Sequence, residues 1–408
     1  MTSLKQPPYL ETAREIGNTM LRNAIWHHDR KCNWTGYWIE PVNGDFKPCV
    51  RSFGPDLYAG TSGIALFLAG LYSEEPDPLL LHTVQGAVQH ALDTMDTAPD
   101  HGFYCGKPGI AASLISIGRL LERPDWIRAG IDLLSTINVL TSGPHETDLI
   151  SGIAGSIPLL LDVHALYPDD TLLQKAVQMG QLLCDSATKN GPQWSWATVP
   201  AARHLTGFSH GAAGISAALL RLYSTTGNND FRTAAQYGLN YEQRHFDQSQ
   251  QNWPDFREAN GNQFPCSHAW CHGAPGIALS RMAAAADLAD LQYQQQASTA
   301  LRTTAANMDT ILREHYHASN YSLCHGLAGN ADVLLYSGQP EYVQMAQTVG
   351  IAGILNYAKP RMPWPSGLNY NQYQTPGLMM GLSGTGYFYL RLHNPHKFRT
   401  VLLPQLFA

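Results

Sequence analysis

The sequence is poor in charge. Lys, Arg, Asp and Glu make up only 14 % of its 408 residues, against ~25 % in an ordinary soluble domain, whereas hydrophobic residues make up 44 %. This composition argues against both disorder and a coiled coil. The 26 basic and 32 acidic residues give a net charge of −6 and form no run of like charge. We therefore expect no nucleic-acid partner and no membrane attachment through a polybasic patch.

Long apolar segments are lacking as well. The N-terminal stretch MTSLKQPPYLETAREIGN has no apolar core like that of a secretory signal, and no later stretch approaches the ~18 uninterrupted apolar residues of a membrane span. We therefore expect a cytoplasmic protein with no segment inserted in a membrane. The seven cysteines are an odd number, scattered along the chain, which disfavours a disulfide framework and favours metal binding or thiol chemistry.

A Gly-x-x-Gly element recurs seven times along the chain. Each copy is followed by a run that is apolar nearly all round and preceded by an amphipathic stretch, which predicts a buried inner helix and a polar-faced outer helix in each repeat. Seven such repeats predict an all-α fold, an α/α toroid of seven inner and seven outer helices. The glycine pairs are Gly60/Gly63, Gly106/Gly109, Gly152/Gly155, Gly211/Gly214, Gly273/Gly276, Gly326/Gly329 and Gly381/Gly384.

The glycines themselves are interpreted as packing residues, because the missing Cβ permits a tight turn and close backbone approach. Each pair opens an inner helix at the same end of the toroid, so the residues beside the pairs should converge on one central mouth. No linker divides the chain, and residues 1–408 are expected to form a single domain. Residues 31–56 are expected to be an irregular loop over the mouth.

Two of the glycine turns carry cysteine and histidine together, in Trp270-Cys271-His272-Gly273 and Leu323-Cys324-His325-Gly326. Equivalent turns lie side by side in a toroid, so Cys271, Cys324 and His325 can reach one ion. Two thiolates and one imidazole suit Zn²⁺, and three protein ligands leave a position open, as in a catalytic site. The alternative is a pair of inert buried thiols beside hydrogen-bonded histidines. Cys266 and the remaining cysteines are interpreted as structural.

At these turns the sequence resembles the LanC-type lanthionine cyclases, over essentially the whole chain. The WCHGAPGI and LCHGLAGN forms are closest to the cyclase domain fused to a dehydratase in class II lanthipeptide synthetases, and since no such domain precedes them here, a free-standing cyclase is expected. The resemblance is carried by SHGAAG (Ser209 to Gly214), WCHGAPGI (Trp270 to Ile277), LCHGLAGN (Leu323 to Asn330) and the terminal GLMMGLSGTGYFYLRL.

The resemblance implies roles for five groups. The zinc ligands of the family match Cys271, Cys324 and His325, and its candidate proton-transfer histidine matches His210. An aspartate ahead of the third glycine turn matches Asp148. The residue after the first zinc cysteine is tyrosine in the stand-alone class I cyclases but His272 here, so a class I-like context is not assumed. Our first candidate for the acid is His210, and the second is His272.

Each of these polar residues has a structural alternative. His210 could hydrogen-bond a neighbouring loop, His272 could orient a metal ligand or Asp148, and Asp148 could cap the helix that follows it.

The function implied is zinc-dependent addition of peptide cysteine thiols to dehydroalanine or dehydrobutyrine, which forms the (methyl)lanthionine thioether rings of a precursor peptide. The expected partners are the dehydrated precursor peptide, a separate dehydratase and a peptide exporter. Two alternatives are an enzyme that adds glutathione or another small thiol to dehydroamino acids, and a non-catalytic peptide-binding scaffold. A toroidal glycan hydrolase ranks last, because it needs paired carboxylates and Asp148 has no obvious partner at an equivalent turn.

Overall fold

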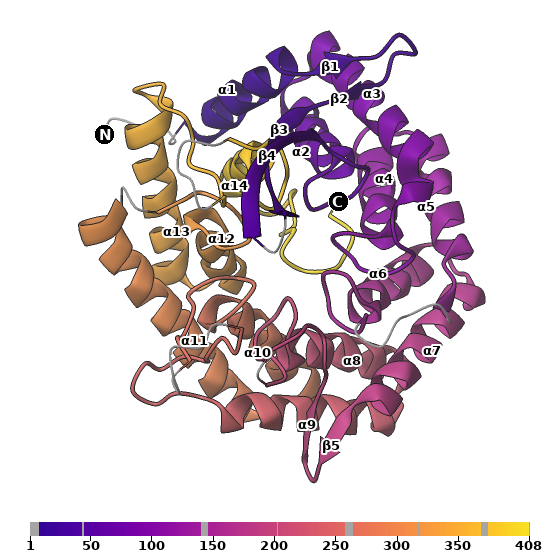
Figure 1. Ribbon diagram of the computed structural model, residues 1–408, viewed down its shortest axis with the longest axis vertical. Helices are drawn as coiled ribbons and strands as arrows, with labels where there is room; N and C mark the ends of the chain where they lie inside the picture. The colour runs from indigo at the N-terminus through magenta and orange to yellow at the C-terminus, as the bar shows by residue number, and fades with distance from the viewer. Residues whose placement is uncertain are drawn as a thin grey trace.

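The computed structural model describes residues 8–42, 45–139, 146–201, 203–257, 264–316, 319–368 and 374–407. Within these ranges the chain forms fourteen α-helices in two concentric rings (Figure 1), which confirms the predicted α/α toroid. The inner helices are α2 (Thr61–Glu74), α4 (Lys107–Leu120), α6 (Ile153–Leu166), α8 (Ala212–Thr226), α10 (Ala274–Leu288), α12 (Leu327–Ser337) and α14 (Leu382–His393). The outer helices are α1 (Tyr9–Arg22), α3 (Pro78–Thr94), α5 (Pro124–Thr136), α7 (Asp170–Ser186), α9 (Asn229–Arg244), α11 (Leu291–Thr310) and α13 (Pro340–Gly353).

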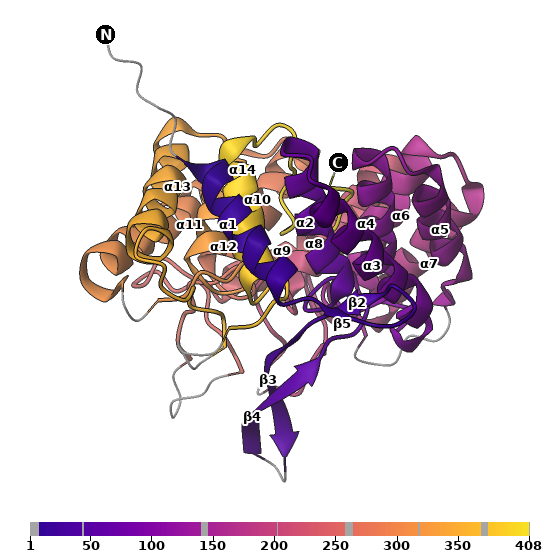
Figure 2. The ribbon, with the colours of Figure 1, turned by 90° about the horizontal axis from the view of Figure 1, so that it is seen from above.

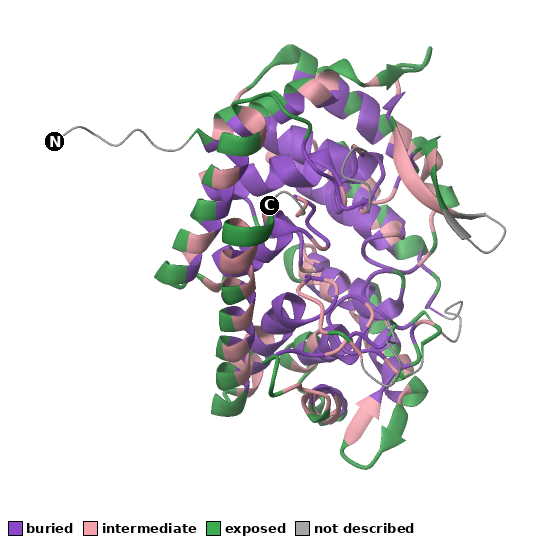
Figure 3. Ribbon diagram, turned by 60° about the vertical axis from the view of Figure 1, so that its left-hand side comes forward, coloured by how far each residue is buried: buried purple, intermediate pink, exposed green. Residues whose placement is uncertain are grey.

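The two rings differ in burial as their sequences predict. The inner helices are buried on most of their surface, and the outer helices expose one polar face (Figure 3). The circle closes where α1 meets α14, with the rings of Tyr9 and Tyr389 6.2 Å apart. None of the described helices is long and apolar enough to cross a membrane.

The helices of the two rings also begin differently. Outer helices α3, α7, α9 and α11 each begin after a residue whose side chain accepts a backbone N–H, namely Asp77, Asp169, Asn228 and Asp290. Inner helices begin after a glycine that has no side chain to cap them. The first N–H groups of the inner helices must therefore find acceptors elsewhere, at the mouth of the toroid.

The second glycine of each pair is needed for a close approach. A Cβ on Gly109 would collide with the carbonyl oxygen of Phe103, six residues earlier, and the same collision recurs at all seven turns. This confirms that the glycine pairs build the turns.

The seven turns are joined by a circle of backbone hydrogen bonds that we call the turn belt. It runs through the residues two positions before the first glycine of each pair. At the third turn Ile150 is the acceptor, and Leu149, the residue before it, is the donor. The bonds lead from Tyr58 to Tyr104 (2.9 Å), Tyr104 to Ile150 (3.2 Å), Leu149 to Ser209 (3.1 Å), Ser209 to Cys271 (3.2 Å), Cys271 to Cys324 (3.3 Å), Cys324 to Met379 (2.9 Å) and Met379 back to Tyr58 (2.9 Å), N–H donor first.

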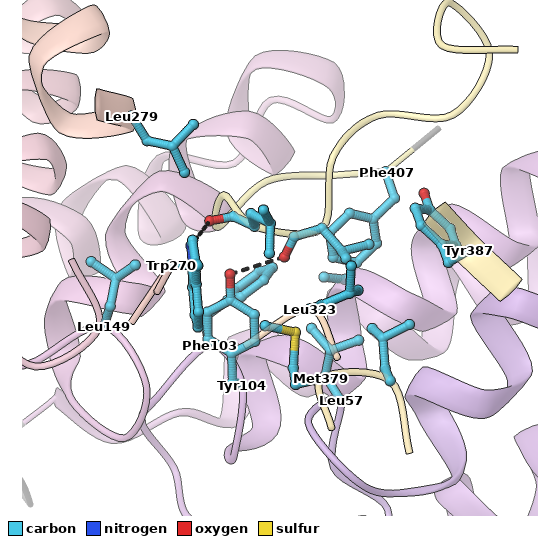
Figure 4. Packing of buried hydrophobic residues seen from close by; sticks show 14 of the residues in the cluster. Leu57, Phe103, Tyr104, Leu149, Trp270, Leu279, Leu323, Met379, Tyr387 and Phe407 are labelled. Carbon is cyan, nitrogen blue, oxygen red and sulfur yellow. Dashed lines mark hydrogen bonds between the residues drawn. The ribbon is translucent and has the colours of Figure 1, made fainter. Parts of the chain in front are cut away.

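The C-terminal segment after α14 fills the centre of the toroid behind this belt. The Tyr104 hydroxyl donates to the carbonyl oxygen of Val401 (2.9 Å), and the Trp270 indole donates to that of Leu402 (3.0 Å), as Figure 4 shows. Phe407 lies edge-on to Phe103 in the same cluster. The turns that face the mouth are thus supported from below by a packed apolar core.

The expectation of an irregular loop over residues 31–56 is wrong. This segment contains β2 (Cys32–Asn33), which pairs with β1 (Ile25–Trp26), and a hairpin of β3 (Thr35–Val42) and β4 (Asp45–Ser52). The β-branched and aromatic residues of β3 favour a strand despite the nearby Gly, Pro and Asn. The hairpin projects from one end of the toroid, opposite the C-terminal segment (Figure 2). A third ribbon joins β5 (Thr188–Asn190) and β6 (Gln193–Ser195).

Candidate functional site

A cavity of about 600 Å³ lies at the mouth of the toroid, where the glycine turns converge. Its wall combines residues of the turns with Trp38 and Arg51 of the β3–β4 hairpin. The further lining residues are Asp56, Tyr58, Ala59, Cys105, Ile150, Ser209, His210, Asp255, Arg257, Ser267, Ala269, Cys271, His272, Cys324 and His325. The structure therefore brings His210, His272 and the Cys-Cys-His set into one cavity, as the repeat pattern predicts.

Cys271, Cys324 and His325 form the metal-compatible cluster of this cavity. Their ligand atoms all lie within 4.8 Å of one another, and within the described residues they form the one such group. The two cysteines occupy adjacent positions in the turn belt, and Cys271 donates its N–H to the Cys324 carbonyl oxygen. His325 Nε2 lies 2.6 Å from the Gly367 carbonyl oxygen, to which only an N–H can donate. Its Nδ1 lone pair is therefore free to bind a metal.

The electrostatics of the cluster agree with a site for a cation. The thiols of Cys271 and Cys324 hydrogen-bond each other. This bond raises the pKa of Cys271, which burial raises further, and it lowers the pKa of Cys324. Burial is the largest single effect on His325 and lowers its pKa, but the hydrogen bond and charge of Cys271 together with the hydrogen bond to Gly367 outweigh it, and the pKa is raised. The three ligand atoms are thus mutually hydrogen-bonded in a buried pocket, and binding of a metal ion would displace the protons that they share.

Asp148 and His210 form a close pair beside the cluster. His210 Nδ1 lies 2.5 Å from Asp148 Oδ2, and the other carboxylate oxygen accepts the N–H groups of Ser151 (2.7 Å) and Gly152 (2.9 Å). Asp148 therefore ties the turn before α6 through N–H groups that precede the helix, instead of capping the helix itself, and it also holds His210, a contact that the sequence did not predict. Since Nδ1 is engaged, Nε2 is the ring nitrogen that His210 offers to the cavity.

Glu242, on outer helix α9, fixes the turn that carries His210. One of its carboxylate oxygens accepts the N–H groups of Gly207 (3.1 Å) and Ala213 (2.8 Å), on either side of His210. The other oxygen is buried without a hydrogen-bond partner among the described residues. Burial raises the pKa of Glu242 from 4.5 to about 7, against the lowering effect of the Arg281 charge.

His272 is buried and does not contact Asp148. Its Nδ1 lies 3.3 Å from the Thr206 carbonyl oxygen and 4.0 Å from Asp255 Oδ2, and its ring stacks 5.9 Å from that of His210. Its Nε2 is buried without a partner among the described residues. Burial and the charge of Arg257 lower the pKa of His272 to about 3.

The sequence interpretation missed several residues of the cavity. Asp255 and Arg257 precede Cys271 in a segment without a repeat signal, so no spacing pointed to them. Asp56 could have been found, because it stands four residues before Gly60 as Asp148 stands four before Gly152. The statement that Asp148 has no carboxylate counterpart at an equivalent turn is therefore wrong.

Comparison with known proteins relates residues 51–405 to the family described as "Lanthionine synthetase C-like protein". The chain is 23 % identical to the Lactococcus lactis subsp. lactis "Lacticin 481/lactococcin biosynthesis protein LcnDR2", an alignment that covers 98 % of this chain but 42 % of that protein. It is also 23 % identical to "Glutathione S-transferase LANCL1" of Danio rerio, covering 87 % of this chain and 85 % of that one.

Solved structures show the same architecture. A "Nisin cyclase" structure superposes with a TM-score of 0.64 at 16 % identity, covering 85 % of this chain and 90 % of that one. A GH76 α-mannanase of Bacteroides thetaiotaomicron superposes with a TM-score of 0.51 at 9 % identity, covering 96 % and 97 %. At such low identity these likenesses concern the fold, and the toroid alone hosts unrelated chemistries.

Proposed function

The chain belongs to the lanthionine synthetase C-like family, and on that basis we propose that it adds cysteine thiols of a dehydrated precursor peptide to dehydroalanine or dehydrobutyrine. The product is a (methyl)lanthionine thioether ring. One observation carries the proposal: the Cys271–Cys324–His325 cluster lines the same cavity as His210, whose Nδ1 is held by the buried Asp148. The first is suited to hold and activate a sulfur, and the second to move a proton.

Zn²⁺ is the ion that fits this donor set. Two sulfurs and one imidazole nitrogen are soft-to-borderline ligands, and their number leaves a fourth tetrahedral position. The hydrogen bond from His325 to Gly367 fixes the ring orientation that ligation needs. When bound, the ion would hold a substrate sulfur as thiolate at neutral pH, where a free thiol with a pKa near ~8.5 is mostly protonated.

The reaction needs one proton donor from the chain. The substrate sulfur forms a bond to the β-carbon of the dehydroamino acid, and the π electrons of the double bond move toward the α-carbon and its carbonyl oxygen. The sulfur gives up its proton to solvent when it becomes a thiolate, and the α-carbon receives one proton from the acid, so the addition is balanced and consumes no co-reactant. We assign this transfer to His210 Nε2, which Asp148 orients through Nδ1.

The position of the cavity supports a peptide substrate. Trp38 and Arg51 of the β3–β4 hairpin line this space of about 600 Å³ together with the turns, and the hairpin projects from that end of the toroid (Figure 2), which offers a peptide a surface beside the cavity. A dehydratase that supplies the dehydroamino acid and an exporter that removes the product belong to the same proposal. The chain spans 42 % of the length of the Lactococcus protein, whose further activities are not assigned to it.

The direct test is incubation of the purified, zinc-loaded protein with a peptide that contains one dehydroalanine and one cysteine. Ring closure leaves the mass unchanged and protects the thiol from alkylation by iodoacetamide. The protein without zinc is the control. A thiol that stays alkylatable at the uncatalysed rate with every such peptide would refute the proposal.

A second candidate is addition of a small thiol such as glutathione to a dehydroamino acid. It is favoured by the relative described as a glutathione S-transferase, which this chain matches over 85 % of that protein's length. The same peptide without its cysteine, incubated with glutathione, separates the two: addition raises the mass by one glutathione. Activity only with the cysteine-containing peptide supports the cyclase.

A further inference from the structure

Arg257 places a fixed cation in the wall of the cavity. Its Nε donates to Asp255 Oδ1 (3.0 Å) and its Nη2 donates to Asp255 Oδ2 (2.7 Å), a two-pronged pair that locks the plane of the guanidinium group. Asp255 is 1 % exposed, whereas the Arg257 side chain is 40 % exposed. The carboxylate is thus the buried anchor, and Nη1 makes no hydrogen bond within the part of the chain that the structure describes, which leaves it available to a ligand.

This guanidinium lies close to the metal-compatible cluster. Its positive charge contributes to lowering the pKa values of Cys324 and His272, and the two cysteines in turn act on Arg257. Arg257 lines the same cavity as Cys271, Cys324 and His210. A substrate held by its sulfur at the cluster would therefore present its neighbouring atoms to this cation.

The other cavity-lining arginine among the described residues is differently placed. Arg51 lies on strand β4 of the projecting hairpin, is paired with Glu40 (3.1 Å), and stacks over the ring of Trp38 at 4.6 Å. Arg257 is therefore the rigidly held cation of the inner wall.

The proposed addition creates a negative charge that needs such a group. As the S–C bond forms at the β-carbon, the displaced π electrons collect on the carbonyl oxygen of the dehydroamino acid, where they stay until the α-carbon is protonated. Fixed donors aimed at a developing oxyanion stabilise the transition state more than the ground state. A planar guanidinium held by a buried carboxylate meets this requirement.

We propose that Arg257 is a catalytic residue whose free N–H groups bind the developing enolate oxygen of the dehydroamino acid, and that Asp255 is the positioning residue that aims it. The inference rests on the proposed addition of a thiol to a dehydroamino acid. It holds for a peptide thiol and for a small thiol alike, because both generate the same enolate.

The test compares Arg257→Met and Arg257→Lys with Arg123→Met. Arg123 is a matched control, since it makes the same two-pronged pair with Asp125 (2.9 and 2.6 Å) at the start of α5, away from the mouth. Each variant is assayed for zinc content, for kcat and KM with the dehydroalanine peptide, and, after replacing zinc by Co²⁺, for the thiolate absorption band that appears on adding a cysteine peptide.

Arg257→Met should keep its zinc and its Co²⁺–thiolate band while kcat falls by about 10²–10³-fold, the usual cost of one oxyanion donor. The kcat of Arg257→Lys should fall less than that of Arg257→Met, because lysine keeps the positive charge. Asp255→Asn should also lower kcat, although Arg257 keeps its charge, because the carboxylate that aims the guanidinium is lost. Added methylguanidinium should partly restore Arg257→Ala. Arg123→Met should match the wild type.

Loss of zinc or of the thiolate band in both Arg257→Met and Arg257→Lys would overturn the inference, and so would a loss confined to KM, which indicates ground-state binding of a substrate carboxylate. An unchanged kcat overturns it as well. These outcomes require an active wild type. A wild type that turns over neither the cysteine-containing peptide nor glutathione instead refutes the proposed function.

Discussion

Cys271 donates its backbone N–H to the carbonyl oxygen of Cys324 at 3.3 Å, although 53 positions separate the two residues in the sequence. The two thiols are therefore brought together by the backbone of adjacent turns. A metal ion would bind to ligands that the fold has already gathered. The cost of ordering them is met by folding itself, which favours tight binding.

Replacement of a proposed ligand should remove the metal without unfolding the chain. Cys271→Ala should reduce zinc from about one ion per chain to a small fraction, because two protein ligands rarely retain the ion. Elemental analysis of dialysed protein measures this. Cys266→Ala is the matched control, since Cys266 is also a free, partly buried cysteine near this turn and does not belong to the cluster. Full zinc content in Cys271→Ala would contradict the ligand assignment.

Replacement of the proposed acid should separate chemistry from metal binding. His210→Asn should retain zinc and slow cyclisation by about 10²–10⁴-fold, the usual contribution of a positioned acid or base. Asp148→Asn should slow it less, because the amide oxygen can still cap Ser151 and Gly152 while the charge that orients His210 is lost. Single-turnover rates measure both, with the exposed His315→Asn as control. Wild-type rates in His210→Asn would leave His210 as a packing residue.

Glu242 should make stability depend on pH. Its pKa is about 7 in the folded protein against 4.5 ordinarily, so the folded state binds more protons than the unfolded state between these values. The free energy of unfolding of the wild type should therefore fall as the pH rises through this window and level off above it. In Glu242→Gln this fall should be smaller by on the order of 3 kcal/mol.

Urea unfolding at pH 4.5, 5.5, 6.5 and 7.5 measures the Glu242 effect. Glu341→Gln, at an exposed position of outer helix α13, is the control and should follow the wild type. The glutamine at position 242 can still accept the N–H groups of Gly207 and Ala213 through its amide oxygen. Parallel pH curves for the wild type and Glu242→Gln would show that folding does not raise the pKa of Glu242.

Removal of the metal should leave the toroid standing. Chelation with EDTA should abolish cyclisation and lower Tm, because bound ligand stabilises the folded state by mass action. The far-UV circular dichroism should stay helical, since the turn belt consists of backbone hydrogen bonds, which need no metal ion. Restored activity with added Zn²⁺ is the control for damage. Unfolding on chelation would mean that the cluster is structural.

The parts of the fold that follow from a repeat could be predicted from sequence. Gly109 and its counterparts recur because no side chain fits against the carbonyl oxygen six residues earlier, and that constraint is visible as a period. The convergence of Cys271, Cys324 and His325 follows from the same period, since equivalent turns must lie side by side. The repeat pattern alone therefore predicts the metal-compatible cluster.

Residues outside the period could not be found in this way. Glu242 lies on an amphipathic outer helix, where a glutamate is expected to face solvent. It is buried only because α9 packs against the turn that opens α8. Arg257 and Asp255 lie in an irregular segment, and their pairing depends on its path through space. The β3–β4 hairpin was missed because turn-forming residues masked the strand signal of Tyr37, Trp38 and Ile39.

The circle of backbone hydrogen bonds distinguishes this protein from open solenoids of helical hairpins. An open array needs special first and last units with polar outer faces, because its end repeats lack a neighbour. Here the N–H of Met379 donates to the carbonyl oxygen of Tyr58 and closes the circle, so every unit has two neighbours and none is terminal. Excision of any one repeat would leave a donor and an acceptor unmatched on either side of the gap. Where the excised repeat carries neither cysteine, the strain of reclosing six units would still act on the turns of Cys271 and Cys324.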